Sequence, residues 1–220
     1  MKNSCFIFVY AMVFVLALAC IVGIAVAEES KTDYMILVNK QHLLPEYWPE
    51  TVELETARNS FDDREFLVEK EALKAFNALR DELLSEGIDI ELDSTYRTVE
   101  YQQELMERFK KEYGEEYALA TVATPGASEH HTGLAIDICI IKDGVVIDEN
   151  EDMIAEREIF AKIHEKLPKY GFILRYPVGK EDITGYGSEV WHFRYIDSPE
   201  IAKEIMDKNI TLEEYLASKK

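Results

Sequence analysis

The spacing of hydrophobic residues along the chain changes between a helical period and the alternation of a strand. Residues 63–86 carry apolar side chains at near-helical spacing up to Gly87, which predicts one helix across this range. Ile88, Ile90 and Leu92 then alternate with polar residues, which predicts a strand with one buried face.

The later part of the chain shows both patterns again. Asp143-Gly144 lies between two apolar runs and predicts a tight hairpin turn. Thr98, Ser198 and Thr211 are the expected N-cap residues of three helices. The predicted helices cover residues 99–113, 115–122, 152–169 and 199–208, with a short last one after 211, and the predicted strands cover 134–141, 145–148, 172–176 and 191–196. Helices mixed with antiparallel hairpins, without a regular strand–helix–strand alternation, predict an α+β fold in which helices flank a small antiparallel sheet.

Three segments are expected along the chain. Residues 1–27 contain an uncharged apolar run that is long enough to span a bilayer as a helix, and the run ends in AVA, which also fits a signal-peptidase site. A membrane anchor and a signal peptide fit this run equally well, and either exports the rest of the chain. Residues 28–60, interrupted by Pro45 and Pro49, are expected to form an arm over the domain, and residues 61–220 the domain itself.

Composition excludes one class of partner and one kind of stabilisation. A net charge of −19 at pH 7, without a basic patch, argues against binding to nucleic acid. Two of the three cysteines lie in the N-terminal apolar run, so Cys139 alone remains in the exported part. An internal disulfide is therefore excluded there, and packing or a metal ion must stabilise the domain.

The stretch TPGASEHHTGLAIDICI, residues 124–140, places two histidines just before a strand that contains an aspartate. The isoleucines of this strand share one face, whereas Asp137 and Cys139 lie on the other. An aspartate in so apolar a strand is disfavoured unless it is ion-paired, hydrogen-bonded or bound to a metal. Cys139 is either a soft ligand beside it or a small buried thiol. Two interpretations therefore remain open. Asp137 forms a salt bridge, or it binds a metal ion together with His130 or His131.

The stretch SEVWHFRYI, residues 188–196, contains a second strand with a histidine. His192 lies on the face opposite to Trp191. Glu189 precedes His192 by three positions, so the two side chains reach one ligand only if the chain turns or bulges near Gly187. Two histidines and one carboxylate are the minimum protein ligands of a catalytic zinc ion, and a nearby carboxylate that is not a ligand serves as general base.

Three blocks, STYRTVEYQ, SEHHTGLAID and GYGSEVWHFRY, resemble in this order the signature blocks of VanY-type D-alanyl-D-alanine carboxypeptidases. This family of zinc peptidases includes LD-carboxypeptidases that trim peptidoglycan stems, and the similarity spans residues 34–216. The resemblance implies zinc ligands at His130, Asp137 and His192 and a catalytic carboxylate at Glu189.

The resemblance also implies a pocket for the C-terminal carboxylate of the substrate, lined by Arg97, Gln102 and Ser128. A guanidinium suits this role because it binds a carboxylate through two hydrogen bonds and stays charged. Arg97 is also expected to act in catalysis, by stabilising the tetrahedral oxygen. Tyr186 is either a substrate contact over the zinc or a packing residue. Val190 departs from the pattern, since many members have proline there, and this bears only on the rigidity of the turn.

The predicted function is that of a zinc carboxypeptidase, with one Zn²⁺, that removes the terminal D-amino acid, D-Ala, from peptidoglycan stem peptides. Two alternatives remain open: a cell-wall endopeptidase on the same scaffold, and a non-catalytic zinc-stabilised binding domain. Glu189 disfavours the binding domain, because a structural zinc site needs no proton shuttle. The protein is expected to be a monomer, secreted or on the extracellular face of a bacterial membrane, with membrane contact through residues 5–27 if these are not cleaved.

Overall fold

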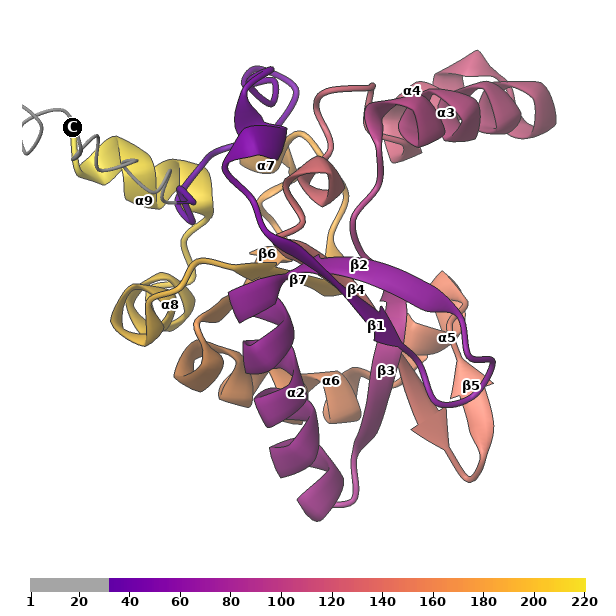
Figure 1. Ribbon diagram of the computed structural model, residues 1–220, viewed down its shortest axis with the longest axis vertical. Helices are drawn as coiled ribbons and strands as arrows, with labels where there is room; N and C mark the ends of the chain where they lie inside the picture. Colours follow the sequence, from indigo (N-terminus) through magenta and orange to yellow (C-terminus); the bar gives the residue numbers. More distant parts are fainter. Residues whose placement is uncertain (1–31) are drawn as a thin grey trace, which may run out of the picture. The chain divides into compact units, whose positions relative to one another are not determined.

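The structure, a computed structural model, describes residues 32–220 (Figure 1). Helices flank small antiparallel sheets, so the predicted α+β class is confirmed. The apolar helix predicted over residues 5–27 lies outside the described residues. Among the helices of the described part, none combines the length and the apolar character needed to cross a membrane.

The elements of residues 32–220 are as follows. The strands are β1 (Leu54–Arg58), β2 (Glu65–Glu69), β3 (Asp89–Ser94), β4 (Ala135–Lys142), β5 (Val145–Ile147), β6 (Phe172–Tyr176) and β7 (Glu189–Tyr195). The α-helices are α2 (Lys70–Ser85), α3 (Val99–Tyr113), α4 (Glu115–Thr121), α5 (Asn150–Ala155), α6 (Arg157–Lys166), α7 (Glu181–Thr184), α8 (Pro199–Asp207) and α9 (Leu212–Ser218). The 3₁₀ helices are η1 (Trp48–Glu50), η2 (Glu129–Thr132) and η3 (Leu167–Tyr170).

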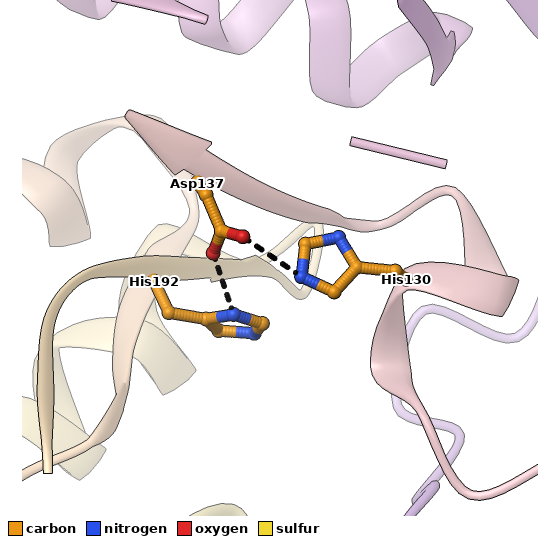
Figure 2. A group of neighbouring side chains, drawn as sticks. All are labelled: His130, Asp137 and His192. Carbon is orange, nitrogen blue, oxygen red and sulfur yellow. Dashed lines mark ion pairs between the residues drawn. The ribbon is translucent and has the colours of Figure 1, made fainter. Parts of the chain in front are cut away.

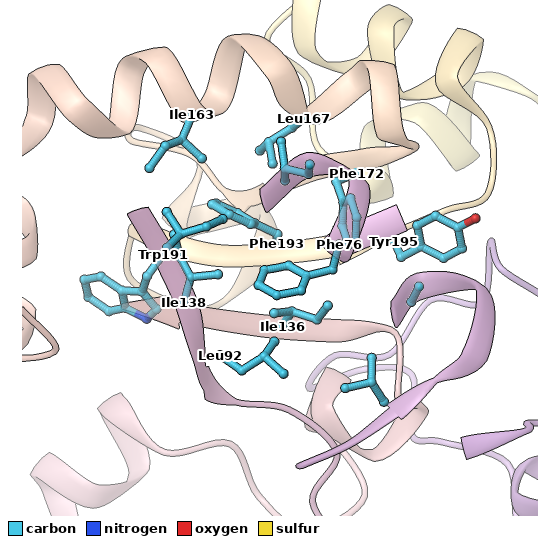
Figure 3. Packing of buried hydrophobic residues seen from close by; sticks show 14 of the residues in the cluster. Phe76, Leu92, Ile136, Ile138, Ile163, Leu167, Phe172, Trp191, Phe193 and Tyr195 are labelled. Carbon is cyan, nitrogen blue, oxygen red and sulfur yellow. The ribbon is translucent and has the colours of Figure 1, made fainter. Parts of the chain in front are cut away.

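A five-stranded antiparallel sheet determines where the predicted site residues lie. Its strand order is β3-β4-β7-β6, with β5 paired to the second half of β4. On one face, Phe76 of α2 and Ile163 of α6 pack with strand residues such as Ile136 in the main core (Figure 3). The central strands β4 and β7 pair Asp137 directly with His192. Because side chains alternate along a strand, both of these point away from the apolar face.

Residues 65–69, predicted as the start of a helix, form strand β2 instead. Phe66 and Val68 are buried, and the residues on either side of Phe66 are exposed. Strand β2 pairs with β1 in a separate two-stranded antiparallel sheet. Helix α2 begins directly after β2, where the Glu69 side chain accepts a hydrogen bond from the Ala72 amide at 2.8 Å. The helical prediction was wrong because Phe66 fits both periods, and pairing with β1 decides between them.

The predicted caps and the predicted hairpin turn are confirmed. The hydroxyl groups of Thr98, Ser198 and Thr211 each accept a backbone hydrogen bond in the first turn of α3, α8 and α9. Asp143 and Gly144 have φ values of 53° and 77°, as the tight turn between β4 and β5 requires.

The single helix predicted over 152–169 is divided in the structure into α5, α6 and η3. Glu156 leaves the helical conformation with ψ of 29° and separates α5 from α6. Pro168 has no N–H to donate, and the chain there tightens into a 3₁₀ turn. The region is helical as predicted, but the prediction of one continuous helix was wrong.

The predicted arm, residues 28–60, includes strand β1, and its part before β1 is attached to the parts of the fold that carry the site. Trp48 is buried, and its Nε1 donates a hydrogen bond to the Thr132 carbonyl of η2 at 3.1 Å. The carbonyl oxygens of Tyr34 and Ile36 accept hydrogen bonds from the Arg194 guanidinium of β7. The segment thus contributes to the positions of both η2 and β7.

Gly133, directly after η2, occupies a position with no free space for a side chain unless Leu54 moves. Its φ is 74°, and a Cβ there would lie 2.6 Å from Leu54 Cδ2. We expect Gly133→Ala to lower the free energy of unfolding by roughly 2–4 kcal/mol, since it strains the backbone and displaces Leu54. Gly144→Ala is the matched control in urea unfolding, because Gly144 has φ of 77° with nothing within 4 Å of a Cβ. Equal losses in the two variants would contradict the role of the Leu54 contact.

Candidate zinc site and substrate pocket

Three side chains from separate elements converge on one point beside the sheet (Figure 2). His130 comes from η2, Asp137 from β4 and His192 from β7, and all three are buried. Asp137 Oδ2 lies 3.1 Å from His130 Nε2, and Asp137 Oδ1 lies 2.9 Å from His192 Nδ1. One ligand atom from each residue lies within 4.8 Å of the other two.

Backbone and side-chain partners orient both imidazole rings. His130 Nδ1 lies 2.7 Å from the Thr95 carbonyl oxygen, so this nitrogen carries the proton and Nε2 presents its lone pair. His192 Nε2 lies 3.5 Å from Glu129 Oε2, and its Nδ1 faces Asp137. The two histidines therefore present different ring nitrogens to the same point, which is the arrangement that outer partners impose in metal sites.

The ionisation of the three residues follows from burial and mutual charge. Burial lowers the pKa of His130 to about 4, so its imidazole is neutral at pH 7, as a ligand must be. Burial lowers the pKa of His192, but the Asp137 charge and hydrogen bonds outweigh this and raise the pKa to about 9. Burial raises the pKa of Asp137, but the two histidines hold it well below its usual range. Metal binding at His192 Nδ1 therefore displaces a proton.

This set of donors suits zinc. Asp137 Oδ1 is buried and lies 2.9 Å from His192 Nδ1, but this ion pair lacks the alignment of a hydrogen bond, which a buried carboxylate oxygen normally has. Two imidazoles and one carboxylate match the ligands of catalytic zinc sites, which keep a further position for water or substrate. A zinc ion bound by these three groups would give Asp137 Oδ1 the directed contact that it lacks.

Glu189 lies beside the three residues without belonging to the cluster. Its Oε2 is 3.6 Å from His192 Nδ1, and its side chain is partly exposed to the pocket. Strand β7 is irregular between Glu189 and Phe193, where its register with β6 shifts, rather than at Gly187 itself, where the sequence suggested a turn or bulge. Burial raises the pKa of Glu189 to about 7, and the nearby Asp137 charge adds to this. A carboxyl group with that pKa can both accept and return a proton at neutral pH.

A pocket of about 430 Å³ contains the cluster and the predicted substrate residues. Its walls include Arg97, Gln102, Ser128 and Tyr186. The Arg97 guanidinium donates to Asp137 Oδ2 at 3.1 Å, so its charge lies directly beside the cluster.

Gln102 and Tyr186, two of the polar side chains at the pocket wall, have fixed orientations. Gln102 Nε2 donates to the Ala123 carbonyl at 2.9 Å, which leaves its second amide hydrogen for another acceptor. Tyr186 donates its hydroxyl hydrogen bond to the Ala127 carbonyl at 3.1 Å. Both residues are therefore held at the wall by the loop before η2.

Two further candidate ligands are engaged elsewhere. His131 Nδ1 lies 2.6 Å from the Arg97 carbonyl, and its Nε2 accepts a hydrogen bond from the Gly126 amide. This buried ring joins the loop before η2 to the backbone of Arg97 and does not face the cluster. The Cys139 thiol contacts the Glu91 carbonyl at 3.8 Å, and burial raises its pKa to about 12, so it is a small buried thiol.

The sequence interpretation missed Glu129. This carboxylate is fully buried and forms ion pairs with Arg175 at 2.7 Å and with Arg194 at 2.8 Å. Burial would raise the pKa of Glu129, but the two guanidinium groups hold it well below its usual range. The signal in the sequence was the pair of arginines inside apolar strands, since a buried arginine requires a buried acid.

Comparison with known proteins gives consistent matches. The family model VanY, D-alanyl-D-alanine carboxypeptidase, matches residues 65–198. The putative carboxypeptidase YodJ of Bacillus subtilis (strain 168) is 36% identical over 190 residues, which cover 85% of this chain and 68% of YodJ.

Three solved structures share the fold. The LdcB LD-carboxypeptidase has a TM-score of 0.72 at 35% identity and covers 87% of this chain and 88% of its own. VanYB in complex with D-alanine-D-alanine has a TM-score of 0.71 at 33% identity, and the match covers 85% of this chain and 99% of the VanYB chain. A glutamate-to-alanine mutant of the vancomycin resistance D,D-pentapeptidase VanY, in complex with Zn(II), has a TM-score of 0.69 at 33% identity. This match covers 83% of this chain and 98% of the VanY chain. The chain therefore belongs to the VanY family of D-alanyl-D-alanine carboxypeptidases.

Proposed function

We propose that this protein is a zinc carboxypeptidase that removes the C-terminal D-amino acid, D-Ala, from peptidoglycan stem peptides. The observation that carries the proposal is the convergence of His130, Asp137 and His192 next to Glu189 in one pocket. The relatives support the substrate class, since they include D-Ala-D-Ala and LD-carboxypeptidases and a structure with D-alanine-D-alanine bound.

In this proposal the zinc ion and Glu189 have different chemical roles. Zinc held by His130 Nε2, His192 Nδ1 and the Asp137 carboxylate would supply a Lewis acid for the scissile carbonyl and for water. Glu189 accepts the proton of the attacking water and then returns it to the nitrogen of the leaving D-amino acid. Glu189 Oε2 lies 3.6 Å from His192 Nδ1, and this distance supports the role of Glu189 as the base. An acid so close to the ligand nitrogen can reach a water that lies between it and the carbonyl carbon.

Arg97 is the proposed partner of negative charge on the substrate. Its guanidinium lies at the pocket wall next to Asp137, where it can face either the terminal carboxylate or the oxygen that becomes negative during the reaction. Gln102 and Ser128 lie in the same wall and are proposed to hold the end of the peptide, so that the last bond lies at the reacting position. Tyr186 is the proposed side wall for this terminal residue.

The proposed place of action is the bacterial cell wall, outside the membrane. Its support is the similarity to LdcB, an LD-carboxypeptidase that recognises peptidoglycan, and the apolar composition of residues 5–27, which fits either a signal peptide or an anchor.

Mass spectrometry of stem peptides incubated with the protein tests the function. The experiment compares peptides that end in D-Ala-D-Ala with peptides in which a single terminal D-Ala follows an L-amino acid. C-terminally amidated forms of both are included. We expect loss of one D-Ala from at least one free-acid peptide, no cleavage of its amide, and no cleavage of any peptide in the presence of a chelator. Equal cleavage of the amidated form would indicate an endopeptidase, and zinc binding without cleavage of any peptide would indicate a binding domain.

A further inference from the structure

Glu129 is a fully buried carboxylate whose two oxygens face different partners. Oε1 accepts hydrogen bonds from Arg175 Nε at 2.7 Å and from Arg194 Nη1 at 2.8 Å. Oε2 lies 3.5 Å from Nε2 of His192. The side chains of the acid and of both arginines have no exposed surface, so water cannot replace any of these contacts.

The arginines are themselves held on their far sides. Arg175 donates two hydrogen bonds to Glu213 of α9, at 2.9 Å and 2.6 Å. Arg194 donates to the carbonyl oxygens of Tyr34 and Ile36, at 3.0 Å and 2.8 Å. If the carboxylate of Glu129 turned away, the buried Arg194 guanidinium would lose the acid with which it is ion-paired, which is strongly unfavourable. This arrangement keeps Oε1 on the arginines and Oε2 on His192.

An ionised carboxylate only accepts hydrogen bonds, so Oε2 requires a hydrogen on His192 Nε2. The neutral ring then has its lone pair on Nδ1, the nitrogen that faces Asp137 at 2.9 Å. His130, the neighbour of Glu129 on η2, is oriented independently by the Thr95 carbonyl. One turn of 3₁₀ helix thus carries a proposed ligand and, beside it, the group that orients another.

We propose that Glu129 is a positioning residue that fixes the tautomer and the orientation of His192, so that Nδ1 is the nitrogen that binds zinc. This inference rests on the zinc site of the proposed function. Neither Glu129 nor its arginines take part in the reaction; they determine how strongly the metal is bound and where.

Glu129→Gln tests the proposal with little change of shape. The arginines retain the side-chain oxygen of glutamine, so its NH₂ group faces His192 Nε2 and favours the tautomer with the proton on Nδ1. We expect zinc affinity, measured in the full-length protein by competition with a chromophoric chelator, to fall about 10- to 100-fold. Glu91→Gln is the matched control, since Glu91 is also a buried acid paired with an arginine, Arg80, but lies outside the pocket. Its zinc affinity should equal that of the unchanged protein.

Equal zinc affinity in a folded Glu129→Gln variant and in the Glu91→Gln control would overturn the proposal. If the Glu129→Gln protein does not fold, ¹⁵N NMR of the imidazole nitrogens in the unchanged, zinc-loaded protein tests the proposal instead. His192 is then expected to bind zinc through Nδ1 with a hydrogen on Nε2, and binding through Nε2 would overturn the proposal. Both measurements report metal binding, so a protein that binds zinc in this way but cleaves no stem peptide would reject the proposed function alone.

Discussion

Glu189→Gln is expected to lower kcat by about 10²- to 10⁴-fold, the usual contribution of a positioned general base, while zinc remains bound. The amide has the size of the carboxylate but cannot accept the proton of the attacking water. Because Glu189 lies 3.6 Å from the nearest ring nitrogen and outside the group of three, its loss leaves the metal ligands in place. Zinc content by elemental analysis and steady-state hydrolysis of a stem peptide measure the two effects separately.

The matched control for this substitution is Glu181→Gln. Glu181 is an exposed glutamate of α7, in the loop region before β7, and it does not line the pocket. Its activity should stay within about twofold of the unchanged protein, since a surface substitution of this kind changes little. If the Glu189→Gln protein kept a tenth or more of its activity, the assignment of Glu189 as the base would be wrong.

Asp137→Asn is expected to abolish activity through the loss of zinc. The neutral amide removes the only anion of the three ligand side chains and leaves His130 and His192 with no charge to offset that of the metal. The unchanged protein should gain about 4 kcal/mol of stability when free zinc is a thousand times its Kd. Thermal unfolding with and without zinc should show a clear rise in Tm for the unchanged protein and little or none for the variant.

A chelator and a second variant complete this experiment. Removal of zinc should abolish hydrolysis by the unchanged protein, and added zinc should restore it. Cys139→Ala is the control for a soft ligand, because this thiol lies on the same strand face but contacts a backbone carbonyl. The Cys139→Ala protein should keep the zinc-dependent rise in Tm, whereas a lost rise would place the thiol among the ligands.

Local signals in the sequence were sufficient for much of the fold. The caps at Thr98, Ser198 and Thr211 and the turn at Asp143-Gly144 depend on interactions within a few residues, and the structure has all of them. The prediction failed at residues 65–69, where the apolar spacing fits a helix and a strand alike. Pairing with β1 decides that case, and no local pattern reports a partner strand.

For the site, strand alternation was enough to separate Asp137 and His192 from the apolar face, because the period of a strand is a property of its own residues. The ligand at the histidine pair, however, was selected by resemblance rather than by spacing. The tertiary structure gives the physical difference: His130 faces the cluster, whereas both nitrogens of His131 have backbone partners.

Three features can be read from the amino-acid sequence alone: the kinds of elements, the strand face on which Asp137 and His192 lie, and the family to which the motifs belong. The folded chain is needed for the distances between those groups, for the ring nitrogen that each histidine presents, and for the buried ion pairs around Glu129. Periodicity and capping act within a few residues, so a short stretch of sequence is enough to indicate them. The contacts among η2, β4, β6, β7 and α9 join residues far apart in the chain, and their geometry exists only after the chain has packed.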